Sequence, residues 1–251
     1  MIRLVRVILA TSIVFVGADA VACGRGNPRA SADSTAVSSN DTVKSKAGSA
    51  VTPTAAGSAD TGRAPHVQRE RIVFAGTSLT AGLGLNPDSA YPMLIQQKID
   101  SADLPFEVIN AGVSGETSAG LVDRLDWLLR GNFDLIVIET GANDMLRGVP
   151  VSALRANLDT ILDRIKRARP NAEIALIQME ALPNLGRQYG SDLHDMYSEV
   201  ARAHHVVLLP FLLNGVAGNP RLNQGDGLHP NPVGERIVAE NVWKGLKPLL
   251  R

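Results

Sequence analysis

From residue 69 onward, short apolar runs alternate with longer segments of helical spacing, and this alternation constrains the fold more than any other feature of the chain. Each apolar run has the length of a buried strand. The predicted strands are 71–75, 106–110, 135–139, 173–177 and 206–209, and the predicted helices are 91–101, 121–130, 151–169, 192–204 and 233–250. Strands that alternate with helices in this way predict right-handed crossovers and a parallel sheet with helices on both faces.

The N-terminal 22 residues have the pattern of a secretory signal peptide. Two arginines, Arg3 and Arg6, precede an apolar stretch of 12 residues at 7–18. That stretch is too short for a comfortable membrane-spanning helix, but it has the usual length of the apolar part of a signal peptide. We therefore expect an exported protein of the periplasm or cell envelope.

Residues 20–23, Ala-Val-Ala-Cys, resemble a bacterial lipobox, in which small residues precede a cysteine that becomes diacylated after cleavage. Ala20 stands where leucine is usual, and Asp19 is an uncommon charge so near a cleavage site. Residues 1–22 are predicted to be a lipoprotein-type signal peptide, with lipidation at Cys23 and a lipid anchor in the membrane. An ordinary secretory signal cleaved near Ala22 is the alternative.

The next segment, residues 23–68, is predicted to be a disordered linker. Residues 24–66 contain 26 Ser, Thr, Ala or Gly among 43 residues, and no Leu, Ile, Phe, Tyr or Trp. Such a segment cannot bury enough apolar surface to offset the entropy lost on ordering. Its expected root-mean-square span is roughly 35–40 Å. Residues 69–251 remain as a single folded domain.

Charge and cysteine content exclude several classes of protein. The chain has 25 Lys+Arg and 25 Asp+Glu, and this balance argues against a nucleic-acid-binding protein, which usually has a basic face. A single cysteine excludes an intramolecular disulfide and a cysteine-rich zinc site.

We expect a monomer.

Candidate functional residues lie in four loops rich in glycine and small polar residues. Three of these loops follow the first three predicted strands, and the fourth precedes the last helix. They are 76–82, 110–117, 140–144 and 225–231. Open parallel sheets bind ligands at the carboxyl ends of their strands, so the first three loops should share one edge of the sheet.

The residues in these loops permit acyl transfer by a serine nucleophile. Ser78 lies just past the first predicted strand, His229 is a candidate base, and Asp226 lies three residues before that histidine. A serine needs a base to accept its proton and a third group to orient the base. Each residue alone is more often structural: serine in a glycine-rich turn, or Asp-x-x-His as a loop hydrogen bond. Their joint occurrence at strand ends predicts a Ser78–His229–Asp226 triad.

Acyl transfer also requires hydrogen-bond donors for the oxyanion that develops in the transition state. The candidates are the backbone N–H groups of Ser78 and Gly112 and the side-chain amide of Asn143. Gly112 allows close backbone approach because it has no Cβ. Asn143 could instead be an ordinary turn residue.

Two other kinds of site can be set aside. A nucleotide loop at 76–84 would need a different glycine spacing and a Gly-Lys-Ser/Thr sequence, which is absent. Asp226, His229 and the pair His204–His205 lack the spacing of a known metal site, and histidines at a helix end are ordinary. We expect no metal and no cofactor.

The four loops together resemble those of the SGNH (GDSL) hydrolases, a superfamily of esterases and lipases. Ser78, Gly112, Asn143 and His229 match the four residues of the name. The resemblance spans residues 71–250 and is strongest to the bacterial arylesterase and multifunctional acyl-CoA thioesterase/lysophospholipase branch. The strings that carry it are 110–118, 141–148, 182–189 and 226–231.

This resemblance implies a three-layer α/β/α flavodoxin-like fold with a five-stranded parallel sheet. It also implies a serine esterase for short to medium acyl esters, with thioesters and lysophospholipids as further candidates. A catalytically impaired envelope binding module and a carbohydrate acetylesterase are the alternatives.

One residue departs from the family pattern. The family usually has Gly-Asp-Ser-Leu, whereas this chain has Thr77 before the serine. Aspartate at that position is not one of the proton-transfer groups. Thr77 could weaken the hydrogen bonds that hold the nucleophile turn, and catalytic efficiency would then fall. Alternatively, it is a neutral substitution.

The resemblance further implies that acyl chains lie near the loops after the third and fourth strands. The candidates to line a groove there are Met145, Leu146, Leu182, Pro183 and Leu185. Each could equally be an ordinary loop-packing residue. Arg147 and Arg187 could meet a headgroup or a carboxylate, but structural ion pairs or solvation are the better interpretation.

Overall fold

Five parallel strands form the centre of the part of the chain that this computed structural model describes, residues 69–251. They are β1 (Glu70–Gly76), β2 (Phe106–Gly112), β3 (Leu135–Ile138), β4 (Glu173–Ile177) and β5 (Val207–Leu209). Their order in the sheet is β2-β1-β3-β4-β5. The chain leaves β1 for β2 on one side and then crosses to β3 on the other. Loops that diverge at such a reversal leave a crevice at the carboxyl edge of the sheet.

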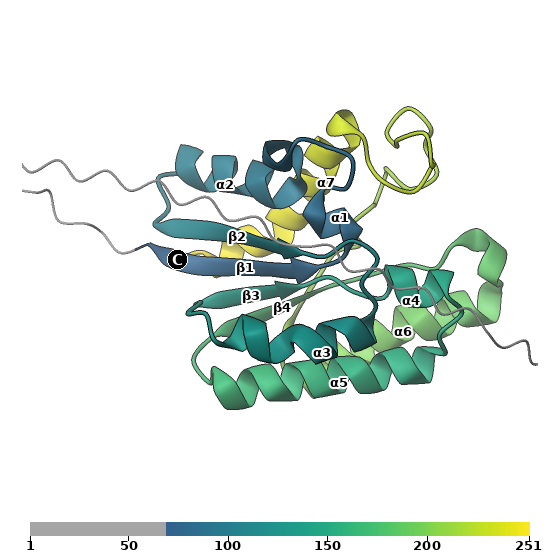
Figure 1. Cartoon of the computed structure of the whole chain (residues 1–251), viewed down its shortest axis with the longest axis horizontal. Coiled ribbons are helices and arrows are strands. Elements are labelled where there is room, and N and C mark those ends of the chain that lie inside the picture. The colour runs from purple at the N-terminus through teal and green to yellow at the C-terminus, as the bar shows by residue number, and fades with distance from the viewer. Residues whose placement is uncertain (1–68) are drawn as a thin grey trace, which may run out of the picture. The chain divides into compact units, whose positions relative to one another are not determined.

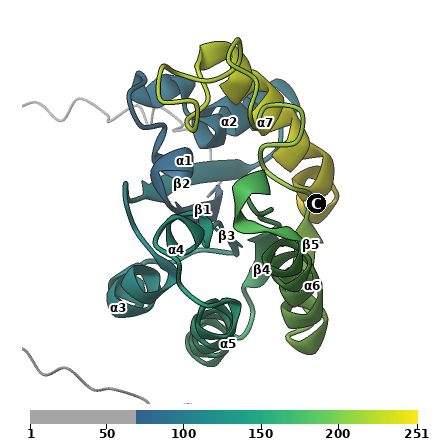
Figure 2. The same cartoon turned by 90° about the vertical axis from the view of Figure 1, so that its right-hand side faces the viewer.

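Helices cover both faces of the sheet and give three layers (Figures 1 and 2). Helices α2 and α7 lie on one face, and α3, α5 and α6 lie on the other. The helices are α1 (Ser78–Ala81), α2 (Tyr91–Ser101), α3 (Ser118–Leu129), α4 (Ala142–Leu146), α5 (Val151–Ala168), α6 (Arg187–Ala203) and α7 (Pro232–Leu246). Short 3₁₀ turns occur at Pro87–Ser89, Pro183–Leu185 and Lys247–Leu249.

The structure confirms the predicted α/β fold with its five-stranded parallel sheet. Three helix boundaries differ from the prediction by three or more residues. Helix α3 begins at Ser118 rather than at 121. Helix α6 begins at Arg187, five residues before the predicted start at 192, and α7 ends at Leu246 rather than 250. Pro248 explains the earlier end, because proline has no backbone N–H to donate to the carbonyl four residues earlier and its ring clashes with that carbonyl.

The core follows from the strand sequences. All four residues of β3 are buried, as are the last five residues of β1. Strands covered on both faces need continuous apolar runs, and β1 and β3 have them. β2, at the edge of the sheet, alternates at its start, where Phe106 and Val108 are buried and Glu107 is exposed.

The N-terminal predictions lie outside the described residues. These are the signal peptide at 1–22, lipidation at Cys23 and the linker at 23–68. Within residues 69–251, no helix is both long and apolar enough to cross a membrane.

A buried carboxylate joins the two helices on one face of the sheet. Glu235 in the first turn of α7 is 1% exposed and accepts the backbone N–H of Tyr91 at 2.8 Å. Tyr91 is the first residue of α2, where backbone N–H groups have no partner within the helix. Burial raises the pKa of Glu235 to about 8, and the Tyr91 N–H opposes that shift.

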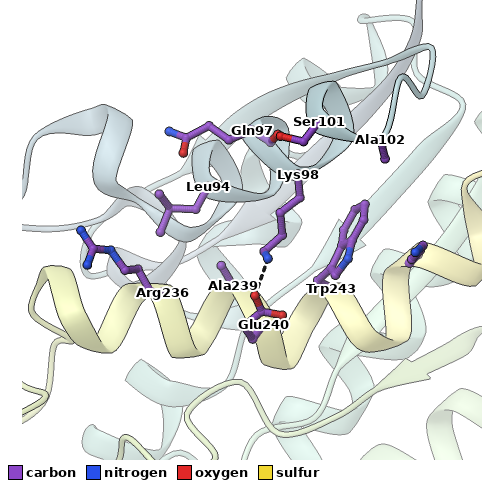
Figure 3. A pocket seen from close by; sticks show the side chains of 10 residues that line it. Leu94, Gln97, Lys98, Ser101, Ala102, Arg236, Ala239, Glu240 and Trp243 are labelled. Atoms are coloured by element: carbon purple, nitrogen blue, oxygen red, sulfur yellow. Dashed lines mark hydrogen bonds and ion pairs between the residues drawn. The ribbon is translucent and has the colours of Figure 1, made fainter.

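A hollow of about 580 Å³ lies between the same two helices (Figure 3). An ion pair between Lys98 of α2 and Glu240 of α7 bridges the hollow, and Trp243 forms part of its wall. None of the predicted site residues lines it.

The raised pKa of Glu235 predicts how stability depends on pH. Glu235 holds its proton in the folded chain up to a pH of about 8, whereas in the unfolded chain it ionises near its usual value of 4.5. The folded state therefore binds more protons between these values, and the free energy of unfolding falls as the pH rises through that window. This one group contributes a slope of at most about 1.4 kcal/mol per pH unit.

Glu235→Gln keeps an acceptor for the Tyr91 N–H and removes the titration. We expect this variant to lose less stability than the wild type between about pH 5 and pH 8 in denaturant titrations. Glu240→Gln removes a half-exposed carboxylate of α7 together with its ion pair to Lys98; this variant is the control and should keep the wild-type slope. Equal slopes for Glu235→Gln and wild type would contradict the prediction.

Candidate active site

Three of the predicted residues form one continuous hydrogen-bonded chain. Ser78 begins α1 immediately after β1, and its Oγ lies 2.8 Å from Nε2 of His229, which is 151 residues away in the sequence. The other ring nitrogen of His229, Nδ1, lies 2.6 Å from Oδ2 of Asp226. The structure therefore brings a hydroxyl, an imidazole and a carboxylate into the order that activates a serine.

Asp226 also shapes the loop that carries the histidine. Its Oδ1 accepts the backbone N–H groups of Leu228 and His229 at 2.9 and 3.0 Å. The hydrogen bond from the His229 side chain, followed by these two backbone bonds, lowers the pKa of Asp226 to about 2. The carboxylate is therefore ionised at neutral pH, and one oxygen fixes the backbone while the other holds the imidazole.

Asn143 has a free hydrogen-bond donor, whereas the backbone N–H of Gly112 is already bound. Asn143 in α4 uses its side-chain amide to donate to the carbonyl of Glu116 at 2.9 Å, which leaves a second amide N–H to offer. Gly112 already donates its N–H to Oδ1 of Asn110 at 3.0 Å. A Cβ on Gly112 would lie 2.3 Å from the Ala81 nitrogen, so this glycine allows β2 and α1 to pack closely.

Gly115, in the same loop, was not singled out from the sequence. It has a φ of +79°, which favours glycine, and it immediately precedes Glu116, the partner of Asn143. Its carbonyl accepts Nη2 of Arg147 at 2.8 Å. Among the described residues, no hydrogen bond uses the Gly115 N–H. The only signal in the sequence was a second glycine in this loop, three residues after Gly112.

A partly buried arginine connects the loops that converge on Ser78. Arg124 of α3 pairs with Glu116, with its Nη2 2.7 Å from Oε2. The same Nη2 donates to the carbonyl of Ala111 at 2.8 Å and lies 3.4 Å from the carbonyl of Gly76. Arg124 therefore holds the ends of β1 and β2 against the loop that contains Gly115.

A second buried carboxylate, Glu139, lies directly beneath the nucleophile turn. It follows β3, is 0% exposed and accepts the backbone N–H of Thr77 at 2.7 Å. The hydroxyls of Thr77 and Thr80 each donate to its Oε2 at 2.9 Å. Burial raises the pKa of Glu139, and these donors oppose that shift. Thr77 thus holds the turn by its side chain as well as its backbone.

Comparison with known proteins identifies the family. The GDSL-like lipase/acylhydrolase family matches residues 74–237. The chain belongs to this family. Esterase TesA of Pseudomonas aeruginosa is 35% identical over 182 residues, which cover 72% of this chain and 90% of that protein. The Escherichia coli K12 protein named thioesterase 1/protease 1/lysophospholipase L1 is 34% identical over 182 residues, 72% of this chain and 85% of that protein.

A crystal structure gives the same assignment. Esterase EstA from Pseudoalteromonas, in a structure described as inhibited by monoethylphosphonate, matches with a TM-score of 0.68 and 32% identity. The match covers 72% of this chain and 98% of that one. Together with the named relatives, this GDSL-like fold makes the chain a carboxylic ester hydrolase.

A cavity of about 320 Å³ opens beside Ser78 and His229. Four of the five predicted groove residues line it: Met145, Leu146, Leu182 and Pro183. Leu185 does not line it and instead packs, partly buried, against the core. The wall also includes residues that sequence reasoning missed, namely Met179, Glu180, Phe211, Leu213 and Leu228. They come from segments after β4 and β5 whose approach to Ser78 depends on the fold.

The remaining polar candidates do not line the cavity. Arg147 contacts the Gly115 carbonyl, and Arg187 is the first residue of α6. His204 pairs with Asp159 of α5 at 2.9 Å. Within residues 69–251, no group of three or more His, Cys, Asp or Glu side chains is arranged to hold a metal ion.

The contact between Thr77 and Glu139 predicts a loss of stability when the hydroxyl is removed. Thr77→Val keeps the branched shape but takes a donor from a buried carboxylate. We expect the free energy of unfolding to fall by about 1–3 kcal/mol. Thr77→Ser, which retains the hydroxyl, should lose less. Denaturant titration of both variants tests this, and a Thr77→Val variant as stable as wild type would show that the hydroxyl does not support Glu139.

Proposed function

We propose that this esterase works through a covalent acyl-enzyme formed on Ser78. The observation that carries the proposal is the hydrogen-bonded chain from Ser78 through His229 to Asp226. Ser78 Oγ attacks the acyl carbonyl while His229 Nε2 accepts the hydroxyl proton. His229 then donates that proton to the leaving alcohol. Asp226 keeps the imidazole oriented and stabilises its protonated form.

The second half of the reaction uses the same groups. A water molecule attacks the acyl-serine ester as His229 takes one of its protons. The proton returns to Ser78 Oγ when the acid is released. Each step balances without a cofactor, since the water supplies the hydroxyl of the acid product.

The oxyanion in both steps is held by the Ser78 N–H, the Asn143 amide and the Gly115 N–H. Gly115 replaces Gly112 in this proposal because the Gly112 N–H is already bound to Asn110. The hydrogen bond from the Asn143 side-chain amide to the Glu116 carbonyl holds this amide near Gly115, the residue before Glu116. Donors fixed before the reaction stabilise the developing charge without reorganisation during it.

The cavity supports an alkyl acyl group as the substrate. Its wall is mainly aliphatic, and its volume of about 320 Å³ suits a short to medium chain. The Escherichia coli relative carries thioesterase and lysophospholipase in its name, so thioesters and lysophospholipids are further candidate substrates. The intact chain of Ser78, His229 and Asp226 supports turnover rather than binding alone.

Replacing the nucleophile tests the mechanism. We expect Ser78→Ala to lower kcat/KM for 4-nitrophenyl butyrate by at least about 10⁴-fold, as removal of a catalytic serine usually does. Wild type should be labelled covalently by a fluorophosphonate probe and Ser78→Ala should not. Ser101→Ala, at an exposed serine of α2, is the control and should behave as wild type. Equal rates for Ser78→Ala and wild type would refute the proposal.

We also propose that the protein is exported and fastened to a membrane through Cys23. The pattern at residues 1–23 supports this proposal. Expressed with its own leader in a bacterium, the mature protein should begin at Cys23 and exceed the mass of its polypeptide by that of a diacylglyceryl group. Cys23→Ser should lack the added mass. An unmodified mature wild-type chain would refute lipidation.

A further inference from the structure

The cavity beside Ser78 contains one carboxylate, and we propose that this group, Glu180, makes the enzyme favour esters that carry a cationic group within the cavity. The inference rests on the proposed function, since it concerns which esters the Ser78 site selects. Glu180 lies three residues after the end of β4, in the segment that also supplies Leu182 and Pro183 to the wall.

Glu180 is held in place by neighbours that leave part of its carboxylate free. Its Oε1 lies 2.8 Å from Nδ1 of His194 and accepts Nε2 of Gln178 at 3.2 Å. Gln178 is 6% exposed, and its backbone N–H is bound to the carbonyl of Leu209 at 3.1 Å. Among the described residues, no hydrogen bond engages Glu180 Oε2. That oxygen is therefore available to a ligand.

The charge of Glu180 is not balanced by a basic residue within the cavity. No lysine or arginine is among the lining residues, and His229 is the only other titratable side chain there. His194, the partner of Glu180, lies on α6 with a side chain that is 57% exposed. Charge interactions are stronger in an apolar cavity than in water, so the carboxylate attracts a cation and repels an anion.

The rest of the wall suits a weakly hydrated cation. A quaternary ammonium group has an apolar surface of methyl groups and no N–H donors, so it loses less hydration on entering an aliphatic cavity than a primary ammonium group does, and a carboxylate offsets part of that loss. Phe211 is the aromatic residue of the lining, and aromatic rings attract such cations. A free carboxylate oxygen, an aromatic ring and aliphatic side chains together form a site for a trimethylammonium group.

Pairs of esters that differ only in charge test this inference. In the first pair the charge is on the acyl part: the 4-nitrophenyl esters of 4-(trimethylammonio)butanoate and of 5,5-dimethylhexanoate. In the second pair it is on the alcohol: acetylcholine and 3,3-dimethylbutyl acetate. The members of each pair have nearly the same shape, so the ratio of kcat/KM for the cationic over the neutral ester reports charge selection alone.

The ratio is measured for wild type, Glu180→Gln and Glu199→Gln. We expect Glu180→Gln to lower it by about five- to tenfold for the pair whose charged part enters the cavity, because one full charge is removed from the cavity wall. The neutral ester of each pair is the reference, so any general effect of Glu180→Gln on hydrolysis cancels in the ratio. Glu199→Gln removes the same charge from an exposed residue of α6 that does not line the cavity and pairs with Arg155 of α5, so it should keep the wild-type ratio.

The outcomes separate the inference from the proposed function. Neutral esters that are cleaved normally, with ratios unchanged by Glu180→Gln in both pairs, would overturn the role of Glu180 alone. A wild-type enzyme that cleaves neither neutral ester would overturn the proposed function and the inference with it. A ratio lowered equally by Glu199→Gln would show that overall charge, and not Glu180, is responsible.

Discussion

The buried carboxylate of Glu139 fixes the nucleophile turn on which the rest of the site depends. Burying a carboxylate costs free energy unless hydrogen-bond donors surround it. Here the donors are the backbone N–H of Thr77 and the hydroxyls of Thr77 and Thr80. All three belong to the turn that contains Ser78, whereas Glu139 follows β3. Satisfying the carboxylate therefore joins the ends of β1 and β3 and sets where the Ser78 hydroxyl lies.

This contact explains how the chain accommodates threonine where the family usually has aspartate. An aspartate at position 77 would place a second carboxylate against Glu139, and two carboxylates so close cannot both ionise readily. One of them would have to keep a proton to donate to the other. Thr77 supplies that donor with a hydroxyl and needs no shared proton. The substitution therefore preserves the hydrogen bond at the nucleophile turn and removes a titrating group from it.

The strands, and the pairing of Asp226 with His229, could be predicted from sequence because their signals are local. Buried strands are continuous apolar runs, and Asp226 and His229 are only three residues apart. Helices α1 and α4 are too short, at four and five residues, to show helical periodicity. In the sequence, Glu139 is the last residue of a predicted strand. Its hydrogen-bond partners follow only from the pairing of β1 with β3. The choice between Gly112 and Gly115 depends on the Asn110 side chain, which spacing alone does not place.

Different parts of the fold hold the two ends of the hydrogen-bonded chain from Ser78 to Asp226. Ser78 is fixed by the sheet, whereas Asp226 and His229 lie on a loop held largely by its own hydrogen bonds, such as Gln224 N–H to the His229 carbonyl at 2.7 Å. The Gln224 side chain donates to the carbonyl of Leu83, just beyond α1, at 2.7 Å. This bond joins the loop to the segment that carries the nucleophile. The 2.8 Å contact between Ser78 and His229 therefore depends on Gln224 as well as on Glu139, although neither residue takes part in proton transfer.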